Sequence, residues 1–186
     1  MKHTILNKYM TAAAMLALSV AGAYANTTTN YSDADIAKKL VHEIRMYPYY
    51  TIFDNISFRV NDGTVELLGE VNQPFKKDDL GRLAQHVKGV TSITNDVKVL
   101  SLSNFDDRLR VQVARAIYRD PVLSRYSLQV VPPIHIIVDQ GHVTLEGVVA
   151  TEMERNEAGI RANGAGLSFG VVTNNLQVEQ PNKSKS

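Results

Sequence analysis

The feature that most constrains this chain is an internal repeat, because a sequence that uses one pattern twice is expected to fold as two similar units. The matching blocks are residues 33–48 with 106–121 at an offset of 73, 58–71 with 136–149 at an offset of 78, and 93–99 with 172–178 at an offset of 79. The offset grows by five residues around Gln129 to Pro133. The repeat predicts two modules, at residues 31–100 and 104–179, joined by the short connector 101–103.

Each module begins with a pattern typical of an amphipathic helix. In the first copy Ile36, Leu40 and Ile44 recur at helical spacing. Pro48 is expected to end this helix, since the residue before a proline is disfavoured in the α region. Asp33 is the expected N-cap.

A β-hairpin is expected to follow each of these helices. Apolar residues alternate on both sides of Asp62-Gly63, and a two-residue turn needs the positive φ that Gly63 and its equivalent Gly141 supply without strain. Gly69 and Gly147 recur further along the two hairpins, and we assign them a structural role. Their missing side chains would permit a bulge or the close approach of a helix.

Each module is expected to end with a second helix and a last strand. In the second module Thr151 and Glu154 form a capping box, but glycines follow where the first copy has leucine and valine, so we expect a short helix ending near Ala162. The recurring Asn95 and Asn174 are expected to satisfy a backbone group at the strand edge. The predicted fold class is α+β, with two tandem αββαβ modules, each a small mixed sheet with helices packed on one face.

The first 25 residues are typical of a secretory signal peptide. Lys2 and Lys8 supply a positive start, residues 10–21 are apolar, and Ala23-Tyr24-Ala25 is a small-x-small cleavage site. The apolar stretch is shorter than the roughly 20 residues that a membrane span needs. We therefore expect cleavage after Ala25 and a mature protein in a bacterial periplasm, while residues 180–186 are polar and expected to be disordered.

Composition excludes several classes of function. The chain has no cysteine, which excludes disulfides, thiolate metal sites, a cysteine nucleophile and a lipoprotein anchor. With 20 Lys+Arg against 19 Asp+Glu the net charge is +1, and loss of the signal peptide leaves −1. A chain of this charge lacks the basic footprint of nucleic-acid-binding proteins, so we expect no nucleic-acid partner.

No catalytic or metal-binding constellation stands out. The sequence has no nucleophile elbow, phosphate loop, H-E-x-x-H motif or EF-hand. His135 would face Glu146 across the second hairpin as an exposed pair, and His142 would lie at its turn, without a third ligand at metal spacing. We expect no catalytic residue, no metal and no cofactor.

The repeated G-x-V-x-L-x-G-x-V hairpin, followed by similar last strands at 93–99 and 172–178, resembles the BON domain. The resemblance covers nearly the whole mature chain. It implies an αββαβ module without catalytic activity, residence in the periplasm, an envelope or osmotic-stress role, and binding to phospholipid or envelope surfaces. In members with two such domains, it implies that the first helix of the second domain is the contact surface.

The residues of that helix support the same surface independently. At about 100° per residue, Arg108, Arg115 and Arg119 fall within roughly 40° of one another, on the side opposite the apolar stripe. Val111 and Tyr118 flank the arginines rather than joining the core. Arginines beside an apolar and an aromatic residue are typical of a helix that contacts anionic headgroups.

We therefore expect peripheral binding to an anionic phospholipid membrane, with envelope proteins as further partners. Two alternatives for the arginine face are an ordinary solvated surface and a contact with a protein. The alternative function is that of a periplasmic chaperone or interaction module for unfolded or envelope proteins. The aromatic segment 47–50 is expected to cover the core or the seam between modules, and the sequence sets no oligomeric state.

Overall fold

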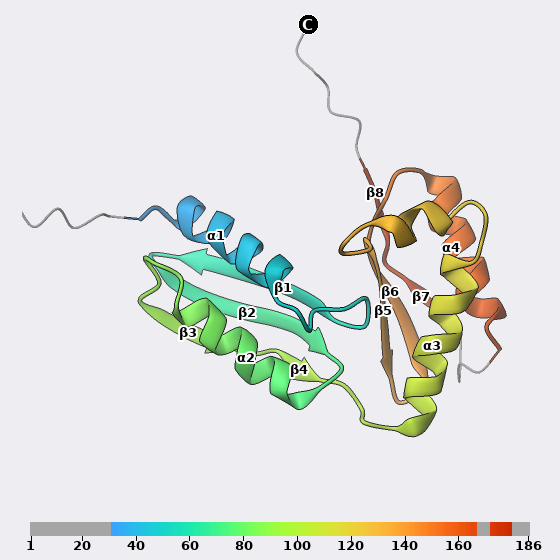
Figure 1. Ribbon diagram of the computed structural model, residues 1–186, viewed down its shortest axis with the longest axis horizontal. Coiled ribbons are helices and arrows are strands. Elements are labelled where there is room, and N and C mark those ends of the chain that lie inside the picture. The colour runs from blue at the N-terminus through green and yellow to red at the C-terminus, as the bar shows by residue number, and fades with distance from the viewer. Residues whose placement is uncertain (1–30, 167–171, 180–186) are drawn as a thin grey trace, which may run out of the picture.

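The computed structural model describes residues 31–166 and 172–179. The predicted signal peptide and the predicted tail, 180–186, lie outside the described residues. The described chain forms two modules, each with two helices on one face of a small sheet (Figure 1). The predicted α+β class with two helix-and-sheet modules is confirmed.

The first module contains, in order, α1 (Asp33–Met46), β1 (Asn55–Asn61), β2 (Thr64–Val71), α2 (Pro74–Gln85), β3 (Ser92–Asn95) and β4 (Lys98–Val99). β1 and β2 are antiparallel, whereas β3 and β4 both run parallel to β2. The expected single last strand is thus divided in two. Apolar residues of both helices and the sheet form the core of this module, among them Ile36, Leu40, Val65, Leu67, Leu80 and Val97.

The second module contains, in order, α3 (Asn104–Tyr118), the 3-10 helix η1 (Ser124–Leu128), β5 (Ile134–Asp139), β6 (His142–Val149), α4 (Glu152–Gly164), β7 (Thr173–Asn174) and β8 (Gln177–Val178). Its pairing repeats that of the first module, with β5 antiparallel and β7 and β8 parallel to β6. The extra residues of the second copy lie in the segment between α3 and β5. The two modules keep separate cores.

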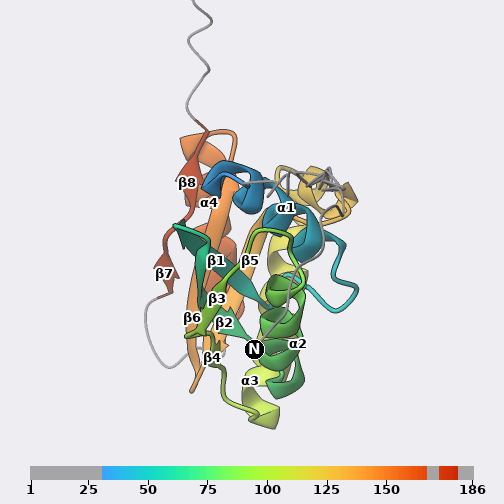
Figure 2. The same cartoon turned by 90° about the vertical axis from the view of Figure 1, so that its left-hand side faces the viewer.

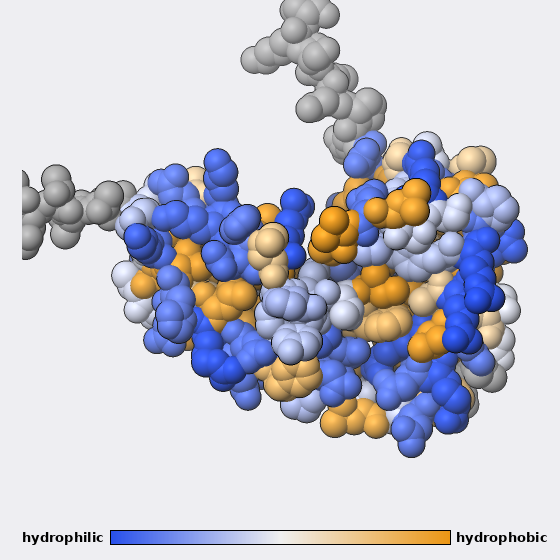
Figure 3. Space-filling model, viewed as in Figure 1, coloured by the Kyte–Doolittle hydropathy of each residue, from blue (hydrophilic) through white to orange (hydrophobic). Residues whose placement is uncertain are grey.

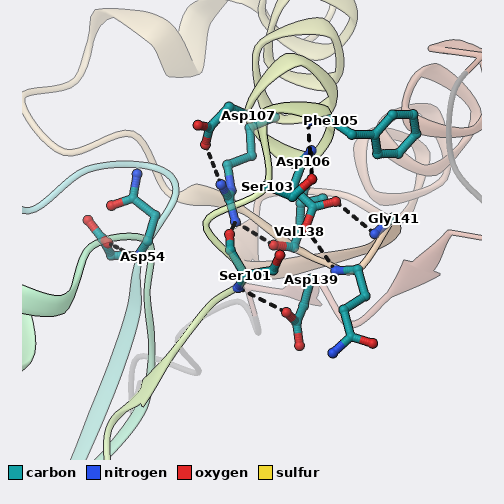
Figure 4. Close-up of polar contacts among 12 residues, drawn as sticks. Asp54, Ser101, Ser103, Phe105, Asp106, Asp107, Val138, Asp139 and Gly141 are labelled. Atoms are coloured by element: carbon teal, nitrogen blue, oxygen red, sulfur yellow. Dashed lines mark hydrogen bonds and ion pairs between the residues drawn. The ribbon is translucent and has the colours of Figure 1, made fainter.

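A recurring aspartate fastens each first helix to its hairpin. The N-cap of α1 is Ser32, so the prediction that Asp33 caps this helix is wrong. Asp33 instead accepts hydrogen bonds from both backbone N–H groups of the β1–β2 turn, each at 2.9 Å. In the second module Asp106 accepts from the N–H groups of Gln140 and Gly141 at 2.9 and 2.8 Å (Figure 4).

The two hairpin turns have the backbone shape that the glycines predict. Asp62 and Gly63 have φ values of 49° and 75°, and Gln140 and Gly141 have values of 51° and 79°. Two successive residues with positive φ make a type I′ turn, whose twist matches that of the flanking strands. The cross-strand register on both sides of each turn follows from this geometry.

Gly69 and Gly147 are required for a different reason from the one expected. They have φ values of 107° and 117°, and a Cβ added there would overlap the carbonyl oxygen of Asn55 or Pro133. The strand register passes both glycines without a bulge. The close neighbour of each glycine is therefore the backbone at or just before the start of the paired strand. The expectation of a bulge or a close helix is wrong.

Each recurring asparagine ties the last part of its sheet to the second helix. The Asn95 amide donates to a carbonyl of α2 at 2.8 Å, and the Asn174 amide donates to a carbonyl of α4 at 2.7 Å. A Cβ on Gly81 or Gly159 would lie only 2.9 Å from the amide nitrogen concerned. A glycine in each helix thus provides the room for this contact.

Helix α4 is not short, so the expectation that it ends near Ala162 is wrong. It has 13 residues and continues to Gly164, whereas α2 has 12. The capping box of Thr151 and Glu154 forms as predicted and stabilises its first turn. Gly159 lowers the helix propensity, but the contact with the last strand uses the space that this glycine leaves.

The first module covers the outer face of β5 and contacts its edge. Every residue of β5 before Asp139 is buried, although alternate side chains point away from the second core. The N–H of Ile136 donates to the carbonyl of Ile52 at 2.7 Å. Asp139 accepts from Lys98 Nζ at 2.6 Å. It also accepts from the backbone N–H of Ser101 at 3.0 Å (Figure 4). Figure 2, viewed from the first module's end, shows this module in front of the second.

His135 lies in this seam, so the prediction that it is exposed is wrong. It pairs with Glu146 in the expected register, but only 9% of its surface is exposed. Its ring packs against that of Tyr50, with 5.6 Å between centroids. The predicted aromatic segment thus contributes one residue to the contact between modules.

Burial makes the free energy of unfolding sensitive to the protonation of His135. Burial lowers the pKa of His135 below its ordinary 6.5, although backbone carbonyls and the charges of Asp54 and Glu146 act in the opposite direction. As the pH falls through 6.5 the unfolded chain binds a proton that the folded chain does not bind until lower pH, so stability is lost below pH 6.5.

The variant His135→Gln is therefore expected to reduce the slope of unfolding free energy against pH below pH 6.5. The difference has an upper limit of about 1.4 kcal/mol per pH unit, which corresponds to one proton. Urea unfolding at several pH values measures it, with the exposed His142→Gln as control. Identical slopes for His135→Gln and the parent protein would contradict the prediction.

Candidate functional site on helix α3

Three arginines of α3 and its C-cap share one exposed face. Arg108 and Arg115 lie within α3, and Arg119 is the C-cap with φ −92° and ψ −8°, so helical spacing continues through it. All three side chains are exposed. Within the described ranges no guanidinium of this face has an ion-pair or hydrogen-bond partner. In Figure 3 strongly hydrophilic residues cover much of α3, with hydrophobic residues between them.

The carboxylates of α3 and its C-terminal end are bound to other groups. Asp106 holds the hairpin turn. Asp107 Oδ1 pairs with Arg110 Nη1 at 2.6 Å, and Asp120 Oδ2 pairs with Arg161 Nη2 at 2.8 Å. Asp107 and Asp120 thus form their ion pairs with arginines outside this face, and not with Arg108, Arg115 or Arg119.

The two residues expected to flank the arginines differ in position. Val111 is 39% exposed and lies on the surface. Tyr118 packs against the core of the second module, and its hydroxyl donates to the carbonyl of Ile134 at 2.6 Å. Burial raises the pKa of Tyr118 above its usual range. The prediction that Tyr118 stands apart from the core is therefore wrong.

An apolar groove of about 390 Å³ runs beside the arginine face. Arg115 and Arg119 line it together with apolar side chains of both modules, including Val111, the ring of Tyr118 and Phe53 from the first module. Cationic groups above apolar side chains suit a ligand that has an anionic group attached to an alkyl chain.

Sequence reasoning missed the segment between α3 and β5. Its Leu128 is 86% exposed, Val130 is fully exposed and Val122 is also exposed. Ser127 and Pro132 of the same segment line the groove. The added length of the second repeat was the signal that marked this segment, but the repeat alone did not show that it borders α3.

The described residues give no support for a membrane-spanning helix or for a metal site. None of the helices described is long and apolar enough to cross a bilayer. Within 31–166 and 172–179, no group of three or more histidine or acidic side chains is placed to hold a metal ion.

The two repeated helix-and-sheet modules and the basic helix face define a tandem-domain protein with a candidate ligand-contact surface. The chain belongs to the BON domain family, whose model matches residues 32–101 and again residues 105–180. BON domains occur in envelope and periplasmic proteins and are generally non-enzymatic.

Other comparisons give only distant similarity. No curated protein is matched by the sequence. Seven chains among the solved structures match, including two described as CdsD, a structural protein of the type III secretion system of Chlamydia trachomatis, and its C-terminal domain. Both are 17% identical with a TM-score of 0.31, and the matches cover 78% and 80% of this chain. They span 61% and 67% of the matched chains, so the first covers less than two thirds of its relative.

Proposed function

We propose that this protein is exported to the periplasm, is processed after Ala25, and binds anionic phospholipid membranes peripherally through the arginine face of α3. It acts as a non-enzymatic envelope protein. The observation that carries the proposal is the set of three exposed, unpaired guanidinium groups, Arg108, Arg115 and Arg119. The resemblance to proteins with two BON domains favours the same helix, and the exposed positions of these side chains support it.

The chemistry of the face suits phospholipid headgroups. A guanidinium donates hydrogen bonds to phosphate in a bidentate geometry, and each basic group near an anionic surface contributes about 1 kcal/mol. The groove beside Arg115, and the exposed Leu128, add apolar surface that can enter the headgroup region. Because the mature chain has a net charge of −1, attraction depends on this local face.

The double variant Arg108→Glu/Arg115→Glu is expected to bind anionic vesicles at least about 30-fold more weakly than the parent protein. Loss of two contributions of about 1 kcal/mol each gives this factor, and the new negative charges add repulsion. Co-sedimentation with phosphatidylglycerol–phosphatidylcholine vesicles measures the change, with pure phosphatidylcholine as the neutral reference. Parent binding should also fall at about 1 M salt, where the screening length is about 3 Å.

The matched control is Lys38→Glu/Lys88→Glu, which makes the same change in net charge at two exposed positions of the first module. This control should retain most of the binding. Equal losses of vesicle binding in the two double variants would show that binding depends only on the net charge of the protein. Unchanged binding after the arginine substitutions would refute the proposed surface.

A further inference from the structure

The two modules differ in the open edge of their hairpins. In a hairpin with a two-residue turn, alternate residues of the first strand direct their N–H and C=O groups away from the second strand. The strand register places these outward groups on Ile134, Ile136 and Val138 of β5, and on the repeat equivalents Ile56, Phe58 and Val60 of β1.

Each of the three outward-facing residues of β5 has one backbone group that is hydrogen-bonded. Two side chains of α3 donate to it, Tyr118 to the carbonyl of Ile134 and Arg110 to the carbonyl of Val138, both at 2.6 Å. Arg110 is only 2% exposed. Between them the N–H of Ile136 donates to a backbone carbonyl of the first module at 2.7 Å. These contacts block the addition of another strand at this edge.

The first module lacks both capping side chains. At the offset of 73, Ala37 stands in place of Arg110 and Arg45 in place of Tyr118. An alanine has no donor, and Arg45 is an exposed side chain without an ion-pair partner among the described residues. The repeat thus provides a direct comparison between a capped edge and an uncapped one.

The edge of β1 consequently keeps free backbone groups. The backbone of Ile56 is hydrogen-bonded to the Tyr50 hydroxyl. The outward N–H and C=O groups of Phe58 and Val60 have no partner in the part of the chain that the structure describes. Unpaired backbone groups on an edge strand are a template for an added strand.

The part of this edge formed by Ile56 and Phe58 borders a groove of about 700 Å³ between the modules. Phe58 lines it with apolar residues of α1 and of the segment before β5, including Met46 and Val130. No acidic side chain is among its lining residues, whereas Arg45 supplies a positive charge, and the buried His135 Nδ1 has no hydrogen-bond partner among the described residues. Figure 3 shows the surface hollowed between the modules, with hydrophobic residues at its sides.

We propose that the open edge of β1 captures an extended, largely apolar peptide segment of a partner protein, which adds to the sheet as a further strand. Backbone hydrogen bonds to Phe58 and Val60 supply the binding, apolar side chains fill the groove, and an anionic group of the peptide faces Arg45. A groove with walls on both sides admits a single strand more readily than the sheet of a second copy. This activity is separate from membrane binding at α3.

A synthetic peptide tests the backbone part of the proposal. The probe is a fluorescent peptide of about eight alternating valine and threonine residues with a free C-terminal carboxylate, and its binding is measured by fluorescence anisotropy. A version N-methylated at alternate residues has the same side chains but lacks the N–H groups on one edge. It should bind at least about tenfold more weakly, because two or more hydrogen bonds are lost. Equal binding of the two peptides would overturn the proposal.

A protein variant tests the location. Ala37→Arg/Arg45→Tyr transfers the capping side chains of the second module to the first, and it should weaken binding of the unmodified peptide at least about tenfold. Ala34→Arg adds a charge at an exposed position of α1 and should leave binding unchanged. Far-UV circular dichroism checks that the variants fold.

Three further outcomes test the location of the site and the identity of its occupant. Unchanged binding in a folded Ala37→Arg/Arg45→Tyr variant would overturn the proposal. So would a dimer in analytical ultracentrifugation that the peptide does not dissociate, since a second copy would then occupy the edge. Peptide binding that persists in Arg108→Glu/Arg115→Glu supports a site separate from α3, and its loss in this folded variant would contradict that location.

Discussion

Replacing Asp54 by alanine is expected to lower the free energy of unfolding by about 3–5 kcal/mol. Asp54 is fully buried and pairs with Lys76 Nζ at 2.6 Å, and the lysine side chain is only 4% exposed. The carboxylate also accepts hydrogen bonds from the backbone N–H groups of Thr51 and Asn72 at 2.9 and 3.0 Å. Alanine would leave a buried ammonium and these donors without their partner. Urea unfolding followed by far-UV circular dichroism measures the loss.

A surface ion pair is the matched control. Arg59 pairs with Glu66 at 2.9 Å, but its side chain is 73% exposed, so Arg59→Ala should cost no more than about 1 kcal/mol. The combined variant Asp54→Ala/Lys76→Met should regain part of the loss, because no buried charge is then left unpaired. A loss below about 1 kcal/mol for Asp54→Ala would show that solvent reaches the pair.

The variant Gly147→Ala is expected to lower the free energy of unfolding by at least about 3 kcal/mol. Its φ of 117° is unfavourable for alanine, and the new Cβ would overlap the carbonyl oxygen of Pro133. Backbone atoms cannot move aside as a flexible side chain can, so the strain and the steric overlap both contribute. Gly69→Ala should behave similarly, since its Cβ would overlap the carbonyl oxygen of Asn55. Denaturant midpoints at constant slope measure both effects.

Gly164 is the contrasting position. Among the described residues, no atom outside its own stretch of helix lies within 4 Å of a Cβ added there, and its φ is not positive. Gly164→Ala should therefore leave stability unchanged or raise it by up to about 1 kcal/mol, because alanine loses less conformational entropy in a helix. If Gly164→Ala lowered the free energy of unfolding as much as Gly147→Ala, the loss at Gly147 could not be attributed to the nearby carbonyl oxygen of Pro133.

Much of the fold could be predicted because it follows from local periodicity. The spacing of Ile36, Leu40 and Ile44 specifies a helix face, and the alternation about Gly63 specifies a hairpin register. The arginine stripe was predictable for the same reason, since helical geometry alone places Arg108 and Arg115 on one side.

Other features of the site depend on which side chains find partners in space. Arg110 looks like another charged residue of α3, yet it is buried because it can donate to the carbonyl of Val138. Tyr118 turns inward because its hydroxyl reaches the carbonyl of Ile134. Neither partner is near in sequence, so helical spacing could not separate these two side chains from the exposed arginines.

The amino-acid sequence by itself determined the two modules, the order of their main elements, the hairpin registers and the side of α3 that carries the arginines. Each of these depends on contacts within a few residues or on the repetition of one pattern. Only the tertiary structure decided that the first module covers β5, that His135 is buried, and that β1 has an open edge while β5 does not. These depend on how two separately patterned surfaces meet. The same apolar pattern is compatible with more than one packing of the two modules. Contacts between residues far apart in the sequence therefore determine which packing forms.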